Sequence, residues 1–576
     1  MRRIRRSRRR AILLTLVAAA LLFALLCPVG RCLSRRPTEK VIVVGAGVAG
    51  LAAAAALSGL ASVLILEAQD RLGGRVHTNR SLGGVPIELG AAWIHRADGN
   101  LVSGLAAQYG CRTVVSENKR LVVYGESGSR VDATTTATVY GLLSKRIMPA
   151  LLRQRRRLRE DGHDDLSLGA LMASMRDVRQ LAGVSRCVLD FLLFRDIVQD
   201  HTADLWQTSA ARYDTDHYGG RGKDHVLPGG YDCIVNGLAK SAAPTEIRSG
   251  RQGEVTKLMW GAHGVSAATA DGLVHTADRV IVTVPLGVLK AGLGDATPAA
   301  NGRRAVSDTS ATASAAAASA AGAGASTLPL PPPQPPREVG APIRFEPSLP
   351  SAQRLAIHRL GWGEALKVGL RFPVAFWPAD AHFLGKVGGG CDNLGSARHM
   401  EFLNVAMYVD GSPPVLLMET EQAHARELAA LDDKGILREV TGALRRMYPE
   451  SYVEPVGHVI ARLGQNPFQR GAFTYMPTGA THQLHTTLGA PLAGGRLLIA
   501  GEHTSALHAG TVHGAVVAGR KAAAHALAAM AGGDAMRGGE LYEEEYTRKL
   551  FTQIYGSNGG IEEDGAEEEE EWDRNP

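Results

Sequence analysis

A carboxylate stands at an informative place near the carboxyl end of the chain. Residues 497–501 (LLIAG) form an apolar, strand-like run, Glu502 follows at once, and a small-residue segment then leads into a helix expected to begin near Val512. A buried carboxylate at the junction of a strand and a helix is costly unless it accepts hydrogen bonds. Glu502 is therefore predicted to have specific partners elsewhere in the sequence.

A glycine-rich turn near the amino end is suited to bind a dinucleotide. Gly45, Gly47 and Gly50 form the pattern GAGVAG, which follows the apolar run KVIVV and opens an Ala-rich helix. Such glycines let the backbone approach a pyrophosphate where the helix N–H groups favour negative charge. Glu67 ends the next strand-like run and is placed to accept from ribose hydroxyls. The alternative is a structural turn with an unrelated carboxylate nearby.

A second glycine pair directly downstream favours FAD over NAD. Gly73, Gly74 and Arg75 lie in the segment DRLGGRVHT. The two glycines allow close approach of the backbone, and the Arg75 guanidinium is expected to pair with the flavin or pyrophosphate side of the cofactor. NAD enzymes of this type do not need such a segment, so the sequence predicts an FAD site.

Several motifs in one order carry a resemblance to a known family. They are VIVVGAGVAGLAAAAAL, LILEAQDRLGGRVHT, IELGAAWIHRADGN, VIVTVPLGVLK, EALKVGLRF, QNPFQRGAFTYMPTGA and GEHTSALHAGTVHGA. Together they resemble the flavin-containing amine oxidase family, and GAAWIH is most similar to its polyamine oxidase branch. The resemblance covers about residues 40 to 530, apart from one insertion.

The resemblance implies a set of contacts to a non-covalent FAD. Glu502 is expected to bind the ribityl chain, and the helix that begins at Thr511 and Val512 is expected to point its amino end at the flavin pyrimidine ring. The backbone of Val255 would hold the adenine. The segment Gly90, Ala91, Ala92 and Trp93 would complete the cofactor site. A cysteinyl flavin is disfavoured because no Cys follows Cys391.

Lys367 has two interpretations. Leu366, Val368, Leu370 and Phe372 alternate onto one face of a strand, so Lys367 points to the other face, which by itself indicates a solvent-facing lysine. The flanking LGWGEALKV instead resembles the family segment whose lysine holds a water at flavin N5. On that basis Lys367 is expected to be catalytic.

Three further residues are expected to frame the substrate. Phe473 resembles one of the two side chains that hold the amine over the flavin ring, and Thr511 takes the other position, where many amine oxidases carry an aromatic residue. His95 resembles the pocket histidine of polyamine oxidases; the alternative is an ordinary loop histidine. Asp200 or Asp204 would attract a second cationic amine. Leu463 replaces a tryptophan expected before QNPFQRG, which leaves substrate choice open.

The implied reaction is oxidation of a polyamine. A neutral amine would lose hydride from its α-carbon to flavin N5, the imine would hydrolyse to an aminoaldehyde, and oxygen would reoxidise the flavin to give hydrogen peroxide. Two alternatives remain: a lysine-specific histone demethylase of the same fold, and an FAD-binding scaffold without turnover. The sequence has neither an amino-terminal chromatin domain nor a heptad-bearing coiled-coil insert, which speaks against the demethylase.

These motifs require an α/β architecture in which distant segments meet. Strand, glycine turn, helix and strand from residue 40 onward predict a βαβ unit and a Rossmann-like, glutathione-reductase-like FAD-binding domain, interleaved with an α+β substrate-binding domain. The predicted FAD-binding parts are 38–130, 225–290 and 460–530, and the substrate-binding parts are 131–224 and 341–459. Residues 291–340 are an Ala- and Pro-rich insertion and residues 535–576 an unfolded acidic tail.

Charge and the amino-terminal segment narrow the partners and the compartment. Residues 1–36 hold ten Arg and no acid, so the other 53 Lys and Arg face 57 Asp and Glu, and no nucleic-acid partner is indicated. The uncharged run 11–27 after the Arg cluster predicts a signal peptide or membrane anchor, hence the secretory pathway; an organelle transit peptide is the alternative. The six scattered Cys imply neither a disulfide framework nor a metal site.

Overall fold

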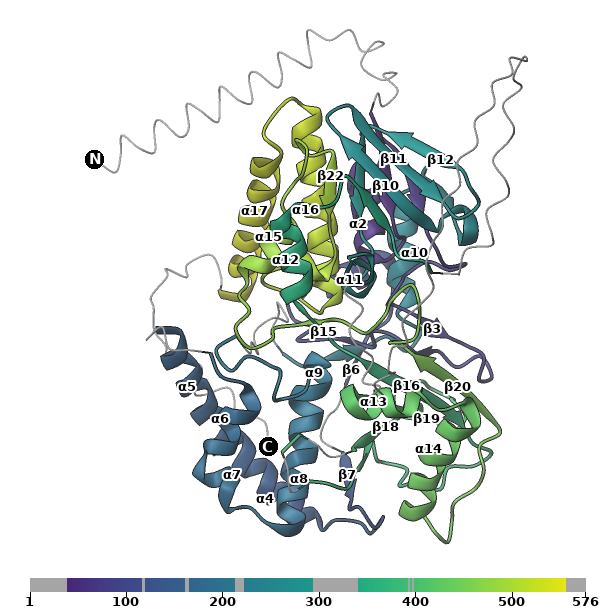
Figure 1. Ribbon diagram of the computed structural model, residues 1–576. Coiled ribbons are helices and arrows are strands. Elements are labelled where there is room, and N and C mark those ends of the chain that lie inside the picture. Colours follow the sequence, from purple (N-terminus) through teal and green to yellow (C-terminus); the bar gives the residue numbers. More distant parts are fainter. Residues whose placement is uncertain are drawn as a thin grey trace, which may run out of the picture.

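The computed structural model describes residues 39–116, 120–160, 165–212, 222–293, 340–391, 394–395 and 398–555. These residues form two layered bodies, one above the other in Figure 1. The predicted leader, residues 294–339 of the predicted insertion and residues 556–576 of the predicted tail lie outside this range. Within it, no helix combines the length and the apolar character that a bilayer span needs.

A parallel sheet forms the centre of the first body. Among the described residues its strands follow the order β22-β13-β1-β2-β9, each parallel to its neighbours. Their bounds are β1 (Lys40–Val44), β2 (Ser62–Leu66), β9 (Glu246–Arg248), β13 (Arg279–Val282) and β22 (Leu497–Ile499). The last four residues of β1 are buried, as expected for a parallel strand covered on both faces. The α/β class predicted from the sequence is confirmed.

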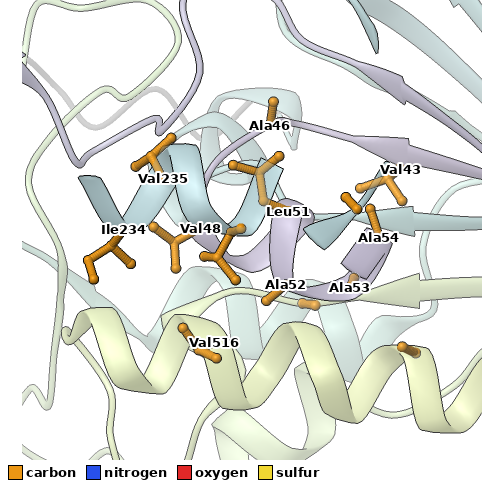
Figure 2. Close-up of a cluster of buried hydrophobic side chains, with 14 of the residues drawn as sticks. Val43, Ala46, Val48, Leu51, Ala52, Ala53, Ala54, Ile234, Val235 and Val516 are labelled. Atoms are coloured by element: carbon orange, nitrogen blue, oxygen red, sulfur yellow. The ribbon is translucent and has the colours of Figure 1, made fainter. Parts of the chain in front are cut away.

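Two helices rich in small residues cover one face of this sheet. Helix α2 (Val48–Leu57) joins β1 to β2, and α16 (Val512–Met530) packs against it. Figure 2 shows Val516 of α16 facing the alanines of α2. A Cβ at Gly519 would lie 2.1 Å from the Ala49 carbonyl oxygen, so the close approach of the two helices requires glycine there. This contact brings the carboxyl end of the chain to the amino-terminal βαβ unit.

A second sheet and several helices complete the first body. The sheet has the strand order β12-β11-β10-β14 and contributes Val255, Leu258 and Val265 to the core beneath β1 and β13. The elements are β10 (Val255–Gly261), β11 (Gly264–Thr269), β12 (Val274–Ala277), β14 (Arg344–Glu346), α3 (Leu101–Tyr109), α10 (Asp232–Ser241), η3 (Gly250–Gln252), α11 (Leu286–Gly292), α12 (Ser351–Arg359), α15 (Gln483–Leu488) and η5 (Glu502–Thr504).

The second body is built on a mixed sheet with the order β20-β16-β19-β18-β17-β7. All neighbours are antiparallel except β17 and β7. The elements of this sheet and its covering helices are β7 (Leu121–Tyr124), β16 (Ala365–Arg371), β17 (Phe383–Lys386), β18 (Met400–Asn404), η4 (Val405–Met407), β19 (Val415–Glu421), β20 (Gly457–Arg462), α13 (Gln422–Ala429) and α14 (Asp433–Met447). One face packs against α13 and α14 through Leu366, Val368 and Leu370. On the other face, part of the sheet packs against residues 82–89 and part lines the cavity described below.

A helical subdomain lies beside this sheet (Figure 1). Its elements are α4 (Ala133–Leu142), η1 (Leu143–Ile147), α5 (Met148–Glu160), α6 (Leu168–Ser174), α7 (Arg176–Gln180), α8 (Gly183–Leu193), η2 (Phe194–Val198) and α9 (Gln199–His201). The segments η1 and η2 are π-helical turns inside longer helices. Short pairings link the bodies: β3 (Thr78–Asn79), β4 (Ile87–Glu88), β5 (Trp93–Ile94), β6 (Val114–Val115), β8 (His225–Val226), β15 (Gly361–Trp362) and β21 (Thr474–Tyr475).

The structure differs from the sequence-based domain boundaries at two strands. Strand β7 was expected in the FAD-binding part 38–130, and the second half of β20, residues 460–462, falls in the expected FAD-binding part 460–530. Both belong to the mixed sheet of the second body, where β7 pairs with β17 and β20 with β16. Strand partners depend on tertiary register, which local composition does not reveal.

The prediction that residue 535 begins an unfolded tail is wrong for its first part. Helix α17 (Ala535–Tyr555) packs against α16. Lys521 of α16 forms an ion pair with Glu543, and the Tyr546 hydroxyl lies 3.3 Å from His508 Nε2. The acidic segment ELYEEEY suggested an unfolded tail, but it belongs to a helix whose Tyr546 contacts His508 of the first body.

The expectation about cysteines also needs correction. The four cysteines in the described part of the chain are paired as Cys111–Cys233 and Cys187–Cys391. Each bond joins segments more than a hundred residues apart. Pairing at such separations leaves no recognisable spacing in the sequence.

Candidate active site

One cavity of about 1020 Å³ lies between the two bodies. Its volume is at the upper end of the range of small-molecule sites, roughly 300–1,000 Å³. The predicted site residues that line it are Gly45, Gly47, Glu67, Arg75, Gly90, Ala91, Ala92, Trp93, His95, Val255, Lys367, Phe473, Glu502, Thr511 and Val512. Gly50 does not line it; a Cβ there would lie 2.0 Å from the Gly45 carbonyl oxygen, so this glycine lets the helix pack against the turn.

The glycine turn leaves backbone open to the cavity at the amino end of α2. Gly45 has φ +103°, a conformation that favours glycine. Gly73 N donates to the Ala46 carbonyl oxygen at 2.9 Å, which sets the two predicted glycine segments side by side. A Cβ on Gly47 would have nothing nearer than 4.0 Å. The first turn of α2 thus presents N–H groups to an open space, which fits a pyrophosphate.

Glu67 is held by the backbone at the end of β2. Its Oε2 accepts from Ala46 N at 2.6 Å and its Oε1 from Gln69 N at 2.8 Å. Burial raises the pKa of Glu67, although these two hydrogen bonds and the charge of Arg71 favour the ionised form. A carboxylate has about four acceptor positions. Two are used here, and the others remain available to ribose hydroxyls in the cavity.

Glu502 has the partners that its position demanded. Its Oε1 lies 2.7 Å from Arg75 Nη1 and accepts from Thr474 Oγ1 at 3.1 Å, while Oε2 accepts from Gly510 N at 2.7 Å. Burial opposes ionisation of this carboxyl, but the Arg75 and His503 charges outweigh it and lower the pKa of Glu502. The Arg75 guanidinium also lies over the Trp362 ring at 5.1 Å. This polar group closes one wall of the cavity.

Thr511 and Phe473 meet at the amino end of α16. Thr511 is the N-cap: its Oγ1 accepts from Gly514 N at 2.9 Å and donates to the His508 carbonyl oxygen at 2.8 Å. A Cβ on Gly510 would lie 3.0 Å from the Phe473 ring, so the ring packs directly against the turn that leads into the helix. The two residues predicted to frame the substrate therefore lie together, and the Thr511 hydroxyl is committed to the helix end.

Lys367 is buried, so its interpretation as a solvent-facing lysine is wrong. Only 4% of the residue is exposed. Its Nζ donates to the Gly90 carbonyl oxygen at 3.0 Å, lies 3.0 Å from Glu419 Oε1, and sits 5.9 Å from the centre of the Trp93 ring. The predicted alternation holds, because Leu366, Val368 and Leu370 pack into the opposite core.

His95 is paired with a carboxylate that the sequence did not single out. His95 Nδ1 lies 3.1 Å from Asp224 Oδ2, and Asp224 Oδ1 accepts from Arg96 N at 2.8 Å. Burial lowers the pKa of His95, but the hydrogen bond and charge of Asp224 and the charge of Asp200 outweigh it, so the net shift is upward. Asp200 lines the cavity, whereas Asp204 does not and instead accepts from Trp206 N.

Sequence reasoning missed the charged residues on the sheet wall of the cavity. Arg195, Asp196, Glu401 and Glu419 all line it. Arg195 Nε lies 2.6 Å from Glu401 Oε1. Burial raises the pKa values of Asp196 and Glu401, and the Arg195 charge offsets this in part. The only sequence signal for these residues was the alternation Glu419-Thr420-Glu421, which places two carboxylates on one face of a strand. That Glu419 faces Lys367 follows only from the strand pairing. Among the described residues no cluster of His, Cys, Asp and Glu could hold a metal ion.

Comparisons with known proteins show which family the chain is similar to. The family described as flavin containing amine oxidoreductase matches residues 48–318 and 325–527. Polyamine oxidase 4 of Oryza sativa subsp. japonica is 29% identical over 503 residues, which cover 84% of this chain and 88% of that protein. Polyamine oxidase 2 of Arabidopsis thaliana is 28% identical over 506 residues, covering 84% and 87%. Lysine-specific histone demethylase 1 homolog 1 of Arabidopsis thaliana is 28% identical over 501 residues, covering 85% of this chain and 52% of that protein.

Proposed function

The chain belongs to the flavin-containing amine oxidoreductase family, and we propose that it is an FAD-dependent polyamine oxidase that uses oxygen as electron acceptor. The observation that carries the proposal is the convergence of Glu67, Arg75, Lys367 and Glu502 on one cavity. These residues come from three distant segments of the chain, and all face the space that a dinucleotide and a small amine would share.

The cavity is suited to a non-covalent FAD. Gly47 and the first turn of α2 offer open backbone for the pyrophosphate, and Glu67 has acceptor positions for the adenosine ribose. At the other end, the first turn of α16 supplies N–H groups where negative charge gathers on a reduced flavin. Bound FAD would supply the chemistry by taking hydride from the α-carbon of a neutral amine.

The protein would orient the amine and exclude water. Phe473 and Thr511 line the cavity next to each other and would flank the reacting carbon. Lys367 would hold the water that hydrolyses the imine, because its ammonium is fixed at the cavity wall. His95, oriented by Asp224, would hydrogen-bond a substrate nitrogen, and the nearby Asp200 would attract a second cationic amine.

The similarity to polyamine oxidases over most of their own length supports this substrate class, and the similarity to a histone demethylase keeps the demethylase as the second candidate. We also propose that the chain folds in the secretory pathway, membrane-anchored or secreted, since two disulfides suit an oxidising compartment.

The test is an anaerobic titration of the FAD-loaded protein with spermine, spermidine, their acetylated forms, a monoamine and a methylated-lysine peptide. Spermine or spermidine should bleach the flavin, and air should restore the colour with release of hydrogen peroxide. Bleaching by the methylated peptide alone would support a demethylase. If no amine bleaches the FAD-loaded protein, the remaining hypothesis is an FAD-binding scaffold without turnover.

A further inference from the structure

Three charged side chains form a row across the cavity face of the mixed sheet. In the strand order β18-β19-β16, Glu401 lies directly opposite Glu419, and Glu419 lies directly opposite Lys367. Residues directly opposite each other in antiparallel strands point to the same face. All three line the cavity, while the neighbouring Leu366 and Met418 pack into the core on the other face.

The charges along this row form two separate ion pairs. Arg195, from the π-helical turn η2, lies 2.6 Å from Glu401, and Lys367 Nζ lies 3.0 Å from Glu419. The Arg195 side chain is also stacked on the Phe383 ring at 4.7 Å, which fixes its position. Because Glu401 is engaged by Arg195, Glu419 is the carboxylate directed at Lys367.

A second carboxylate on β19 does not compete for the lysine. Glu421 lies opposite Ala365, two residue pairs further along β19, and does not line the cavity. Among the described residues, neither of its carboxylate oxygens has a hydrogen-bond partner. Its only link to Lys367 is therefore through the electrostatic field.

The lysine is held from two sides. Its ammonium has three N–H donors. One is directed at the Gly90 carbonyl oxygen, which belongs to the first body, and Glu419 of the second body accepts from the same group. These contacts keep a long, flexible side chain in one position at the boundary of the two bodies and leave one donor for a group in the cavity.

We infer that Glu419 is a positioning residue that holds the Lys367 ammonium toward the reacting atoms of the bound amine and cofactor. This inference rests on the proposed function for the part that Lys367 plays. Glu419 acts through Lys367 and does not itself bind substrate. Its loss frees the ammonium to turn away, and displacement of a catalytic group by about 1 Å costs on the order of 100-fold in rate.

The first measurement does not depend on activity. FAD-loaded wild-type protein and the Glu419→Gln variant are treated briefly with formaldehyde and a mild reductant, and methylation of Lys367 is quantified by peptide mass spectrometry. We expect at least about fivefold faster methylation in the variant, since a released side chain explores open space. Glu364→Gln is the matched control: this carboxylate, next to β16, pairs with Arg426 at 3.5 Å outside the cavity lining. It should leave Lys367 methylation unchanged.

The second measurement is a double-mutant cycle on amine-dependent flavin reduction and on flavin reoxidation. Glu419→Gln should lower kcat by about 10- to 100-fold with little change in KM. In the Lys367→Met background the same change should cost less than about twofold, because residues that act as one unit are not additive. An equal loss in both backgrounds, or a loss confined to KM, would overturn the inference and make Glu419 a structural or substrate-binding residue.

Two further outcomes keep the inference separate from the proposed function. If no amine reduces the wild-type flavin, the proposed function fails, but the positioning of Lys367 by Glu419 is still tested by methylation. Unchanged methylation of Lys367 in Glu419→Gln would overturn that positioning role. If Glu419→Gln does not fold, Glu419→Asp retains the charge at shorter reach and should give faster methylation of Lys367 than wild type. Equal methylation in Glu419→Asp and wild type would also overturn the inference.

Discussion

Arg75 Nη1 lies 2.7 Å from Glu502 Oε1, so one buried ion pair joins two motifs that are 427 positions apart. The pair links the loop after the second glycine segment to the turn before α16. Both elements line the cavity proposed for FAD. The ion pair therefore fixes the relative position of two walls of the proposed cofactor site.

Replacing Glu502 by Gln should weaken FAD binding by at least about tenfold. The change leaves the Arg75 charge without its buried partner and removes a charge-assisted acceptor, and such a loss costs roughly 1.5–3 kcal/mol. The dissociation constant can be measured from quenching of FAD fluorescence. Asp232→Asn is the control, since Asp232 forms a partly exposed pair with Arg80 at 2.7 Å and should leave FAD affinity unchanged. Equal affinity of Glu502→Gln and wild type would refute the role of this carboxylate.

Glu67→Gln should weaken FAD but not FMN. Glu67 lies at the end of β2, where it would meet the adenosine ribose, and FMN has no adenosine. We expect a loss of FAD affinity of about tenfold or more, the value of one hydrogen bond to a charged group. Titration of both flavins into the apoprotein checks this. Parallel losses for FAD and FMN would mean that Glu67 supports the glycine turn through Ala46 rather than the ribose.

The sequence identified the parts of the site that local motifs define. The turn from Gly45 to Gly50 and the following helix lie within one βαβ unit, so spacing alone located Glu67. The alternation around Lys367 correctly gave its face but not its burial, because what covers that face comes from Trp93 and Gly90 in the other body. Local patterns encode a residue's face, and only the fold supplies its neighbours.

The rest depended on long-range pairing. Glu419 is recognised as a site residue only from its strand register with Lys367, and Asp224 only from its contact with His95. The disulfides join distant cysteines that show no motif spacing. The charge of segment 540–546 obscured helix α17, because its packing against α16 depends on a few tyrosines among glutamates.

The disulfides should be detectable and stabilising. Peptide mapping without reductant should recover Cys111 linked to Cys233 and Cys187 linked to Cys391. The double variant Cys111→Ser/Cys233→Ser should lower the free energy of unfolding by about 2–5 kcal/mol, as removal of a bond that closes a long loop does. The single variant Cys111→Ser serves as control and should be no more stable than the double one. Recovery of the free thiols in wild type would contradict both bonds.

Thr511 should tolerate Ser better than Ala. Its hydroxyl caps α16, and loss of such a cap costs about 1 kcal/mol. Thr511→Ala should therefore lower the melting temperature by about 1 °C, while Thr511→Ser should retain it. Amine oxidation should fall only modestly in both variants, because the hydroxyl is engaged by Gly514 and His508 and only the methyl group is left to flank the substrate. A large loss of kcat in Thr511→Ser would show that the methyl group is essential for positioning the substrate.

Glu88 should make stability fall as the pH rises. Burial raises the pKa of Glu88 from 4.5 to about 7, although the hydrogen bonds from Tyr231 N and Thr78 Oγ1 oppose the shift. The unfolded chain loses this proton near pH 4.5 and the folded chain only near pH 7, so between these values the folded state binds more protons and its stability decreases with pH. Each unit corresponds to about 1.4 kcal/mol.

Glu88→Gln removes that titration while its side-chain carbonyl can still accept from Tyr231 N. Relative to wild type, the variant should gain roughly 1–3 kcal/mol of stability between pH 4.5 and pH 7.5, an amount bounded by the size of the shift. Urea unfolding of both apoproteins at several pH values measures the difference, and Glu246→Gln, an exposed carboxylate at a sheet edge, is the control. Curves for Glu88→Gln and wild type that stay parallel across this range would show that folding does not raise the pKa of Glu88.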